Sequence, residues 1–140
     1  MIVLDTDHIN VLQSEGSVAS TLVANMSRSA DGDFATTAIT IEEQMRGWLA
    51  LIHRLDDAHR QIPAYERLVD LFSFFARWKI LPFDGRAADE LKKLREQRVR
   101  LGTMDLKIAA IALVNDALVL TANLRDFQQV PRLRIENWLN

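Results

Sequence analysis

Short apolar runs that suit buried strands alternate along this chain with longer stretches that suit helices. The runs lie at residues 2–4, 34–40, 78–81, 117–121 and 133–135. Between them, residue patterns typical of helices cover 6–12, 18–26, 40–52, 63–76, 87–100 and 105–113. Alternation of this kind predicts a parallel sheet with helices on both faces. We therefore expect an α/β fold, a three-layer α/β/α arrangement around a short, mostly parallel central sheet.

The length of 140 residues suits a single domain, residues 1–140, that can bury about two thirds of the unfolded chain's surface. Hydrophobic residues make up 49% and charged residues 26%, as in a typical globular protein. The net charge of -2 excludes a polycation, so contact with nucleic acid needs a local basic patch or a metal ion that bridges to phosphate.

The chain contains no cysteine, which excludes disulfides, thiolate metal sites and a cysteine nucleophile. We see no signal peptide and no apolar stretch long enough to span a bilayer. The expectation is a cytoplasmic protein that makes no contact with a membrane.

Polar residues mark where the helices are expected to begin. Thr6 or Asp7 is expected to cap the first short helix. The segment Thr40-Ile41-Glu42-Glu43 matches the capping-box pattern, which predicts that a helix starts there. Residues 53–61 either extend this helix or form a loop, and Pro63 suits the first turn of the next helix.

Acidic residues fall where such a fold gathers side chains. Asp5 follows the first strand, and Glu43 lies in the first turn of the helix after the second strand. Asn123 and Asp126 follow the fourth strand. Ligands of open α/β sheets bind at the carboxyl ends of the strands, so these positions are expected to share one edge. Asp105 starts a helix that leads into a strand, and only the tertiary fold could bring it there.

Each of these positions also has a structural interpretation. Asp5 could be a turn or cap residue, Glu43 a capping-box partner, Asp105 an N-cap, and Asp126 a solvated turn residue. Together, however, acids without matching cations repel each other, because two charges about 4 Å apart cost about 1 kcal/mol even in water. A hard cation such as Mg²⁺, which prefers oxygen ligands, would relieve this repulsion.

The balance of charge favours two ions. Asp5, Glu43 and Asp105 with one phosphodiester carry four negative charges, which two Mg²⁺ ions balance, and a two-metal site stabilises both the attacking and the leaving oxygen. Such a site needs no histidine base. Because no histidine shows the spacing of a metal ligand, we interpret each as a surface or helix-packing residue; they are His8, His53 and His59.

Five segments in order match a known set of motifs. Leu4-Asp5-Thr6-Asp7 matches an "LDTN" start, and Thr40 to Gly47 matches T-x-x-E-x-x-x-G. Gly102 to Ala110 matches G-x-x-D-x-x-I-A-A, Thr121 to Phe127 matches T-x-N-x-x-D-F, and Val130 to Trp138 matches a closing strand. With these motifs the chain resembles, from end to end, the PIN-domain ribonucleases, and specifically the VapC-type toxins of bacterial toxin–antitoxin pairs.

The resemblance implies an endoribonuclease that depends on Mg²⁺ or Mn²⁺, with one or two ions, and that cleaves RNA through a metal-activated water. It also implies a cognate VapB-like antitoxin that blocks the site, and a homodimer. By position, the catalytic and metal-holding acids would be Asp5, Glu43 and Asp105. Thr6 and Thr121 would orient waters or carboxylates.

Two positions depart from the family's pattern. Asn123 stands where many PIN domains have a fourth acid, so it would be a neutral metal ligand; Asp126 is an alternative ligand or a cap of the turn. Asp7 stands where Asn is common, and we interpret it first as a helix cap and second as a supporting residue of the site.

A basic cluster precedes Asp105 and consists of Lys92, Lys93, Arg95, Arg98 and Arg100. It is either a solvated helix face or an RNA-binding rim beside the metal site. Among the aromatic residues, Phe74 and Phe75 cannot share one helical face neatly, so one of the two is expected to face a partner chain. An antitoxin helix could pack there.

Three other interpretations compete with this one. A strand that ends in Asp-x-Asp also opens the haloacid-dehalogenase phosphatases, but the later lysine and acidic pair of that fold have no place here. A receiver domain needs a lysine after a late strand, where this chain has Thr121-Ala122-Asn123. The third is a catalytically weak PIN-fold module that binds RNA or a partner, and dependence of RNA cleavage on metal would separate it from the enzyme.

Overall fold

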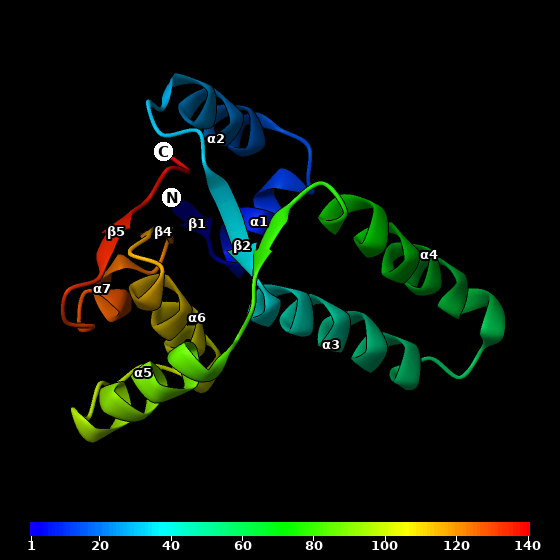
Figure 1. Cartoon of the computed structure of the whole chain (residues 1–140). Coiled ribbons are helices and arrows are strands. Elements are labelled where there is room, and N and C mark those ends of the chain that lie inside the picture. Colours follow the sequence, from blue (N-terminus) through cyan, green and yellow to red (C-terminus); the bar gives the residue numbers. More distant parts are fainter.

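A five-stranded parallel sheet forms the centre of the computed structural model, which describes residues 1–140 (Figure 1). Its strands are β1 (Ile2–Leu4), β2 (Phe34–Thr37), β3 (Lys79–Leu81), β4 (Leu118–Leu120) and β5 (Arg134–Glu136). Their order across the sheet is β3-β2-β1-β4-β5, so β1 lies in the middle. All neighbouring strands pair in parallel, which confirms the α/β fold expected from the alternating pattern.

The helices are α1 (Thr6–Leu12), α2 (Ser17–Arg28), α3 (Ala38–Arg54), α4 (Ala58–Phe75), α5 (Gly85–Glu96), α6 (Thr103–Val114) and α7 (Leu124–Phe127). They cover both faces of the sheet. Successive residues of a strand point to opposite faces, so a strand made only of apolar residues is buried on both. Ile2 and Leu4 of β1 pack in a core with α1, α2 and the end of α4. Val3 packs on the other face against α6. Both faces of β1 are therefore buried.

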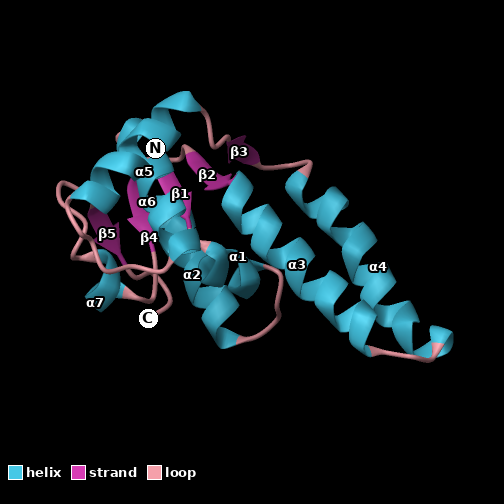
Figure 2. Ribbon diagram, turned by 90° about the horizontal axis from the view of Figure 1, so that it is seen from below, coloured by secondary structure: helices cyan, strands magenta, loops and turns pink.

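Helices α3 and α4 form an antiparallel pair that extends away from the sheet (Figure 2). The chain between them is short, and Asp57 caps α4 by accepting a hydrogen bond from the backbone N–H of His59. Pro63 lies inside α4, not in its first turn, so that prediction was wrong: the helix begins at Ala58. None of the helices is both long enough and apolar enough to cross a membrane.

The predicted starts of α1 and α3 were also wrong. Asp5 itself caps α1 through its side chain, whereas Thr6 and Asp7 lie inside the helix. Thr37 caps α3 by accepting from the backbone N–H of Thr40, so the second strand ends three residues earlier than expected. Asp5 directly follows β1 and Thr37 is the last residue of β2, so each helix cap lies at the end of a strand and almost no loop separates the two elements.

Candidate active site

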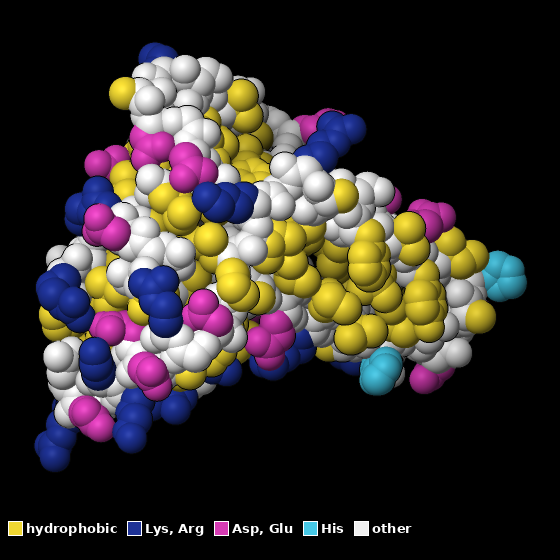
Figure 3. Space-filling view, in the orientation of Figure 1, with side chains coloured by type: hydrophobic (Ala, Val, Ile, Leu, Met, Phe, Trp, Pro, Cys, Tyr) yellow, Lys and Arg dark blue, Asp and Glu magenta, His cyan; other side chains and the backbone are white.

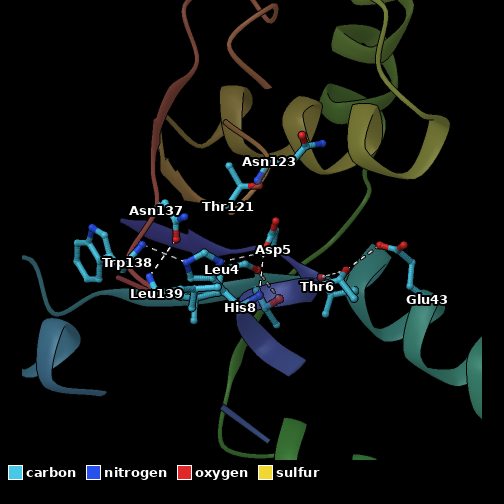
Figure 4. A network of polar contacts seen from close by, with 12 residues as sticks. Leu4, Asp5, Thr6, His8, Glu43, Thr121, Asn123, Asn137, Trp138 and Leu139 are labelled. Atoms are coloured by element: carbon cyan, nitrogen blue, oxygen red, sulfur yellow. Dashed lines mark hydrogen bonds and ion pairs between the residues drawn. The ribbon is translucent and has the colours of Figure 1, made fainter. Parts of the chain in front are cut away.

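The carboxyl edge of the sheet gathers the acidic residues that the sequence singled out. Asp5 directly follows β1, and Thr121 directly follows its neighbour β4 (Figure 4). Glu43 reaches the same edge from the first part of α3, which starts where β2 ends. Helix α6 leads into the parallel strand β4, so its first turn, with Asp105, lies at this edge too. The tertiary fold thus provides the placement that Asp105 needed.

The other acids at this edge affect the pKa of Asp105. Burial raises the pKa of the Asp105 carboxyl to about 6, and four nearby carboxylates add to the effect: Glu43, Asp5, Asp7 and Asp126. No lysine or arginine forms an ion pair with Asp5, Glu43 or Asp105. The cluster therefore holds negative charge that the chain itself does not balance.

Asp5 is the most buried of these acids, with 5% of its surface exposed. Its Oδ1 atom accepts a hydrogen bond from the backbone N–H of His8 at 2.9 Å and lies 3.2 Å from the Nδ1 atom of the His8 ring. His8 is fully buried and touches the site, which no motif or spacing in the sequence indicated. His53 and His59 are exposed, as expected of surface residues.

A pair of threonine hydroxyls orients Glu43. The Thr6 hydroxyl donates to Oε1 of Glu43 at 2.7 Å. The hydroxyl of the buried Thr40 lies 3.1 Å from the Thr6 oxygen and is the donor of that bond, because the Thr6 proton already points to Glu43. The contact agrees with an orienting role for Thr6. Thr40 was noticed only as a capping-box residue, so the sequence missed this contact.

The turn after β4 has a hydrogen-bond network of its own. The buried Thr121 hydroxyl accepts from the backbone N–H of Asn123 at 3.0 Å. The side-chain amide of Asn123 donates to Oδ2 of Asp126 at 3.1 Å. This second contact supports the interpretation of Asp126 as a residue that stabilises the turn. Asp7 is exposed, and its pKa is raised first by partial burial and then by the Asp5 carboxylate.

The donors at this edge suit a hard cation, but they form no closed cage. No group of three or more His, Asp or Glu side chains converges closely enough to hold a metal ion. The side chains present offer only carboxylate, amide and hydroxyl oxygens, which Mg²⁺ and Mn²⁺ prefer. Mg²⁺ is usually held by one or two carboxylates together with waters and substrate phosphates. The residues therefore fit an open site of that kind.

A polar cavity of about 500 Å³ opens beside Glu43, between α1 and α3. One wall holds a chain of amides, in which Nε2 of Gln44 donates to Oδ1 of Asn10 and to Oε1 of Gln13, both at 2.7 Å. Arg54 lies among the lining residues as well. No pattern in the sequence indicated this cavity, because its walls come from two helices that are separated along the chain.

The basic cluster is fully exposed, but it is not one helix face. Helix α5 ends at Glu96, so Arg98 and Arg100 lie in the connection to α6, although the predicted helix reached residue 100. None of the five basic side chains forms an ion pair within the chain. They remain available to an anionic ligand, and their role in RNA binding stays a prediction.

The three phenylalanines near the end of α4 differ in exposure. Phe75 is buried in the core, and Phe74 stacks on Trp78 with 5.9 Å between ring centres. Phe72 is the exposed one, with 69% of its surface accessible. Phe74 is half-buried and lines a cavity with Trp48 and Leu71, so the expectation that one of the pair faces a partner chain stays a prediction.

Comparisons with known proteins agree with this geometry. The family model of the PIN domain matches residues 2–133. The tRNA(fMet)-specific endonuclease VapC of Salmonella typhimurium is 30% identical over 94 residues, which cover 64% of this chain and 71% of that protein. VapBC-1 from nontypeable Haemophilus influenzae superimposes with a TM-score of 0.71 at 24% identity over 100% of both chains. FitAcB from Neisseria gonorrhoeae gives a TM-score of 0.71 at 25% identity over 98% of this chain and 97% of that one.

Proposed function

We propose, from the premise that this chain belongs to the PIN domain family, that it is a metal-dependent endoribonuclease and the toxin of a type II toxin–antitoxin module. The similarity to a VapC endonuclease and to VapBC-1 supports the proposal. The observation that carries it is the placement of Asp5, Glu43 and Asp105 at one edge of the sheet, where no lysine or arginine forms an ion pair with any of them. The proposed substrate is RNA, and the proposed cofactor is Mg²⁺ or Mn²⁺, as one or two ions.

In this proposal Asp5, Glu43 and Asp105 hold the metal. When bound, the ion supplies a water activated for attack on the phosphodiester and offsets the charge of the phosphate. Thr6 fixes one oxygen of Glu43 and thereby the direction in which that carboxylate points. Thr121 holds the backbone at Asn123, whose amide contact with Asp126 orders the turn at the rim of the site. Asn123 and Asp126 remain candidates for an additional ligand.

The test is cleavage of purified transfer and ribosomal RNA by the purified chain. We expect cleavage with Mg²⁺ or Mn²⁺ and none with EDTA. Asp105→Asn, purified in parallel to control for contaminating nucleases, is expected to be folded and inactive. Cleavage that persists in EDTA, or in the Asp105→Asn protein, would overturn the assignment of the site. Metal-independent RNA binding without any cleavage would instead favour the catalytically weak binding module.

An apolar surface on α3 and α4 supports the proposal of an antitoxin partner. Five large hydrophobic side chains there are 42–69% exposed: Leu49, Ile62, Tyr65, Val69 and Phe72. Hydrophobic side chains gather over this helix pair in the space-filling view (Figure 3). A cavity of about 280 Å³ with only hydrophobic lining lies between Ile41 and Phe72. Patches of this kind mark interaction sites.

The same helix carries this surface and part of the site. Ile41, Met45 and Leu49 of α3 line a mostly hydrophobic cavity of about 620 Å³, whereas Glu43 lines the polar cavity on another side of the same helix. We propose that a VapB-like antitoxin places an apolar segment here. To block the site as well, the antitoxin would have to extend around α3 to Glu43. A homodimer, also proposed, would be seen by light scattering of the purified chain.

A further inference from the structure

His8 bridges two parts of the chain that lie far apart in sequence. Its side chain is fully buried, at the start of α1 and directly behind Asp5. The Nδ1 atom lies 3.2 Å from Oδ1 of Asp5, and the Nε2 atom lies 3.3 Å from the backbone nitrogen of Trp138 (Figure 4). A buried polar ring with a partner at each nitrogen is fully satisfied, so its orientation is fixed.

The two contacts allow only one arrangement of the ring proton. A backbone N–H can only donate, so Nε2 of His8 must be the acceptor of the bond from Trp138 and carries no proton. The proton of the neutral imidazole is then on Nδ1, where it donates to Oδ1 of Asp5. His8 is therefore a neutral hydrogen-bond donor to the carboxylate.

The segment that holds the ring is itself fixed. The backbone oxygen of Trp138 accepts from the Asn25 side chain at 2.9 Å, and the backbone N–H of Leu139 donates to Oδ1 of Asn137 at 3.0 Å. The Trp138 ring meets Phe34 edge to face, with 6.2 Å between the ring centres. The contacts of Trp138 with Asn25 and Phe34 hold its backbone amide beside His8.

The two carboxylate oxygens of Asp5 differ in their contacts. Oδ1 accepts from both the backbone and the ring of His8, whereas Oδ2 has no hydrogen-bond partner in the chain. No buried side-chain oxygen or nitrogen in the structure lacks a hydrogen-bond partner, so Oδ2, which has none, is accessible from outside. One oxygen is therefore anchored and the other is open to a ligand, as is usual where a second residue orients a metal-binding side chain.

We infer that His8, anchored by the backbone amide of Trp138, is a positioning residue that holds Oδ1 of Asp5 through its Nδ1 proton and leaves Oδ2 free for a cation. The inference rests on the proposed function insofar as Asp5 is a metal ligand. The hydrogen-bonded geometry of His8 stands independently of that function, so it can be tested in metal-free protein.

The first test is the tautomer of His8 in the metal-free wild type, read from long-range ¹H–¹⁵N correlations of the imidazole rings at neutral pH. The signals of His8 are identified as those that are missing from the spectrum of the His8→Asn variant. We expect a protonated Nδ1 and an unprotonated Nε2. A ring protonated on Nε2, alone or on both nitrogens, would overturn the inference.

The second test is Mn²⁺ affinity, measured by calorimetric titration of metal-free protein whose fold has been verified by circular dichroism. His8→Leu removes the donor and is expected to weaken Mn²⁺ binding about tenfold or more. His8→Asn keeps a donor, because its Nδ2 is bonded to Cγ as Nδ1 is in histidine, and should recover most of the affinity. Equal affinity of wild type and His8→Leu, or equal loss in both variants, would contradict the inference.

These outcomes separate the inference from the proposed function. A wild type that binds no Mn²⁺ and cleaves no RNA would refute the proposed function, and the tautomer would still decide the contact between His8 and Asp5. A wild type that cleaves RNA while His8→Leu binds Mn²⁺ equally well would leave the function intact and refute the positioning role.

Discussion

At the scale of single residues, Asp105 connects the chemistry of the site to its stability. Its folded-state pKa of about 6 lies above the unfolded value near 3.9, so the folded protein binds this proton more tightly. The proton therefore stabilises the fold fully below pH of about 4, and this contribution is lost as the pH rises through about 6. At neutral pH the charged Asp105 opposes folding as long as no cation is bound.

Asp105→Asn should therefore be more stable than wild type in EDTA at pH 7. Two pKa units correspond to about 3 kcal/mol, and partial exposure of the side chain reduces the expected gain in the free energy of unfolding to about 1 kcal/mol. The gain should shrink as the pH falls from 6 toward 4. Denaturant unfolding of both proteins across this range measures the difference; a gain that is constant with pH would show that the Asp105 charge is not its cause.

The hydroxyl of Thr6 allows a second residue-scale prediction. Thr6→Val keeps the shape of the side chain but removes the donor to Glu43 and the acceptor for the buried Thr40 hydroxyl. We expect a loss of about 1–3 kcal/mol in unfolding free energy, since Thr40 loses its partner, and a clear fall in the rate of RNA cleavage. Thr6→Ser keeps the hydroxyl and is the matched control. Similar cleavage rates in the two variants would argue against an orienting role for this hydroxyl.

At the scale of elements, the surface proposed for the antitoxin lies on the paired helices α3 and α4, which extend away from the sheet. Phe72 projects from α4 with 69% of its surface exposed, so its replacement removes little packing within the chain. Substitutions at such positions usually change stability by less than about 0.5 kcal/mol. Substitutions on this surface should therefore leave the acidic residues at the carboxyl edge of the sheet in place.

Phe72→Glu should release a co-expressed antitoxin while RNA cleavage by the free chain is unchanged. A charge buried in an apolar interface is costly, so the antitoxin is expected to be lost from the affinity-purified toxin. Val23→Glu on α2, where Val23 is also exposed at 51%, is the control and should retain the antitoxin. Retention by the Phe72→Glu variant, or loss by both variants, would place the antitoxin elsewhere.

At the scale of the whole molecule, the sequence predicted the order of elements well and some of their junctions poorly. Residues 2–4 could be read as a strand because the central strand of a parallel sheet is apolar on both faces. The cap of α1 and the end of β2 were misplaced because Asp5 and Thr37 act as helix caps, which depends on backbone angles that no spacing reveals.

The acids of the candidate site could be proposed from the sequence because each lies near the start or the end of a recognisable element. The contact of His8 with Trp138 could not be found in this way, because it joins residues 130 positions apart through a backbone amide, which carries no sequence signal. The pairing of Thr6 with Thr40 is hidden for a similar reason. Side chains at the edge of the sheet are predictable from topology, whereas the groups that orient them depend on the packed structure.

Metal binding should act on the stability of the whole chain, because the candidate ligands come from β1, α3 and α6 and are together only in the folded state. A ligand that binds only the folded protein stabilises it by about 2.7 kcal/mol at a hundred times its dissociation constant. We expect Mn²⁺ to raise the thermal unfolding midpoint of the wild type and to have little effect on Asp105→Asn, with Ser27→Ala on α2 as a control that responds like wild type. An equal rise in all three proteins would indicate that Mn²⁺ binds away from this edge of the sheet.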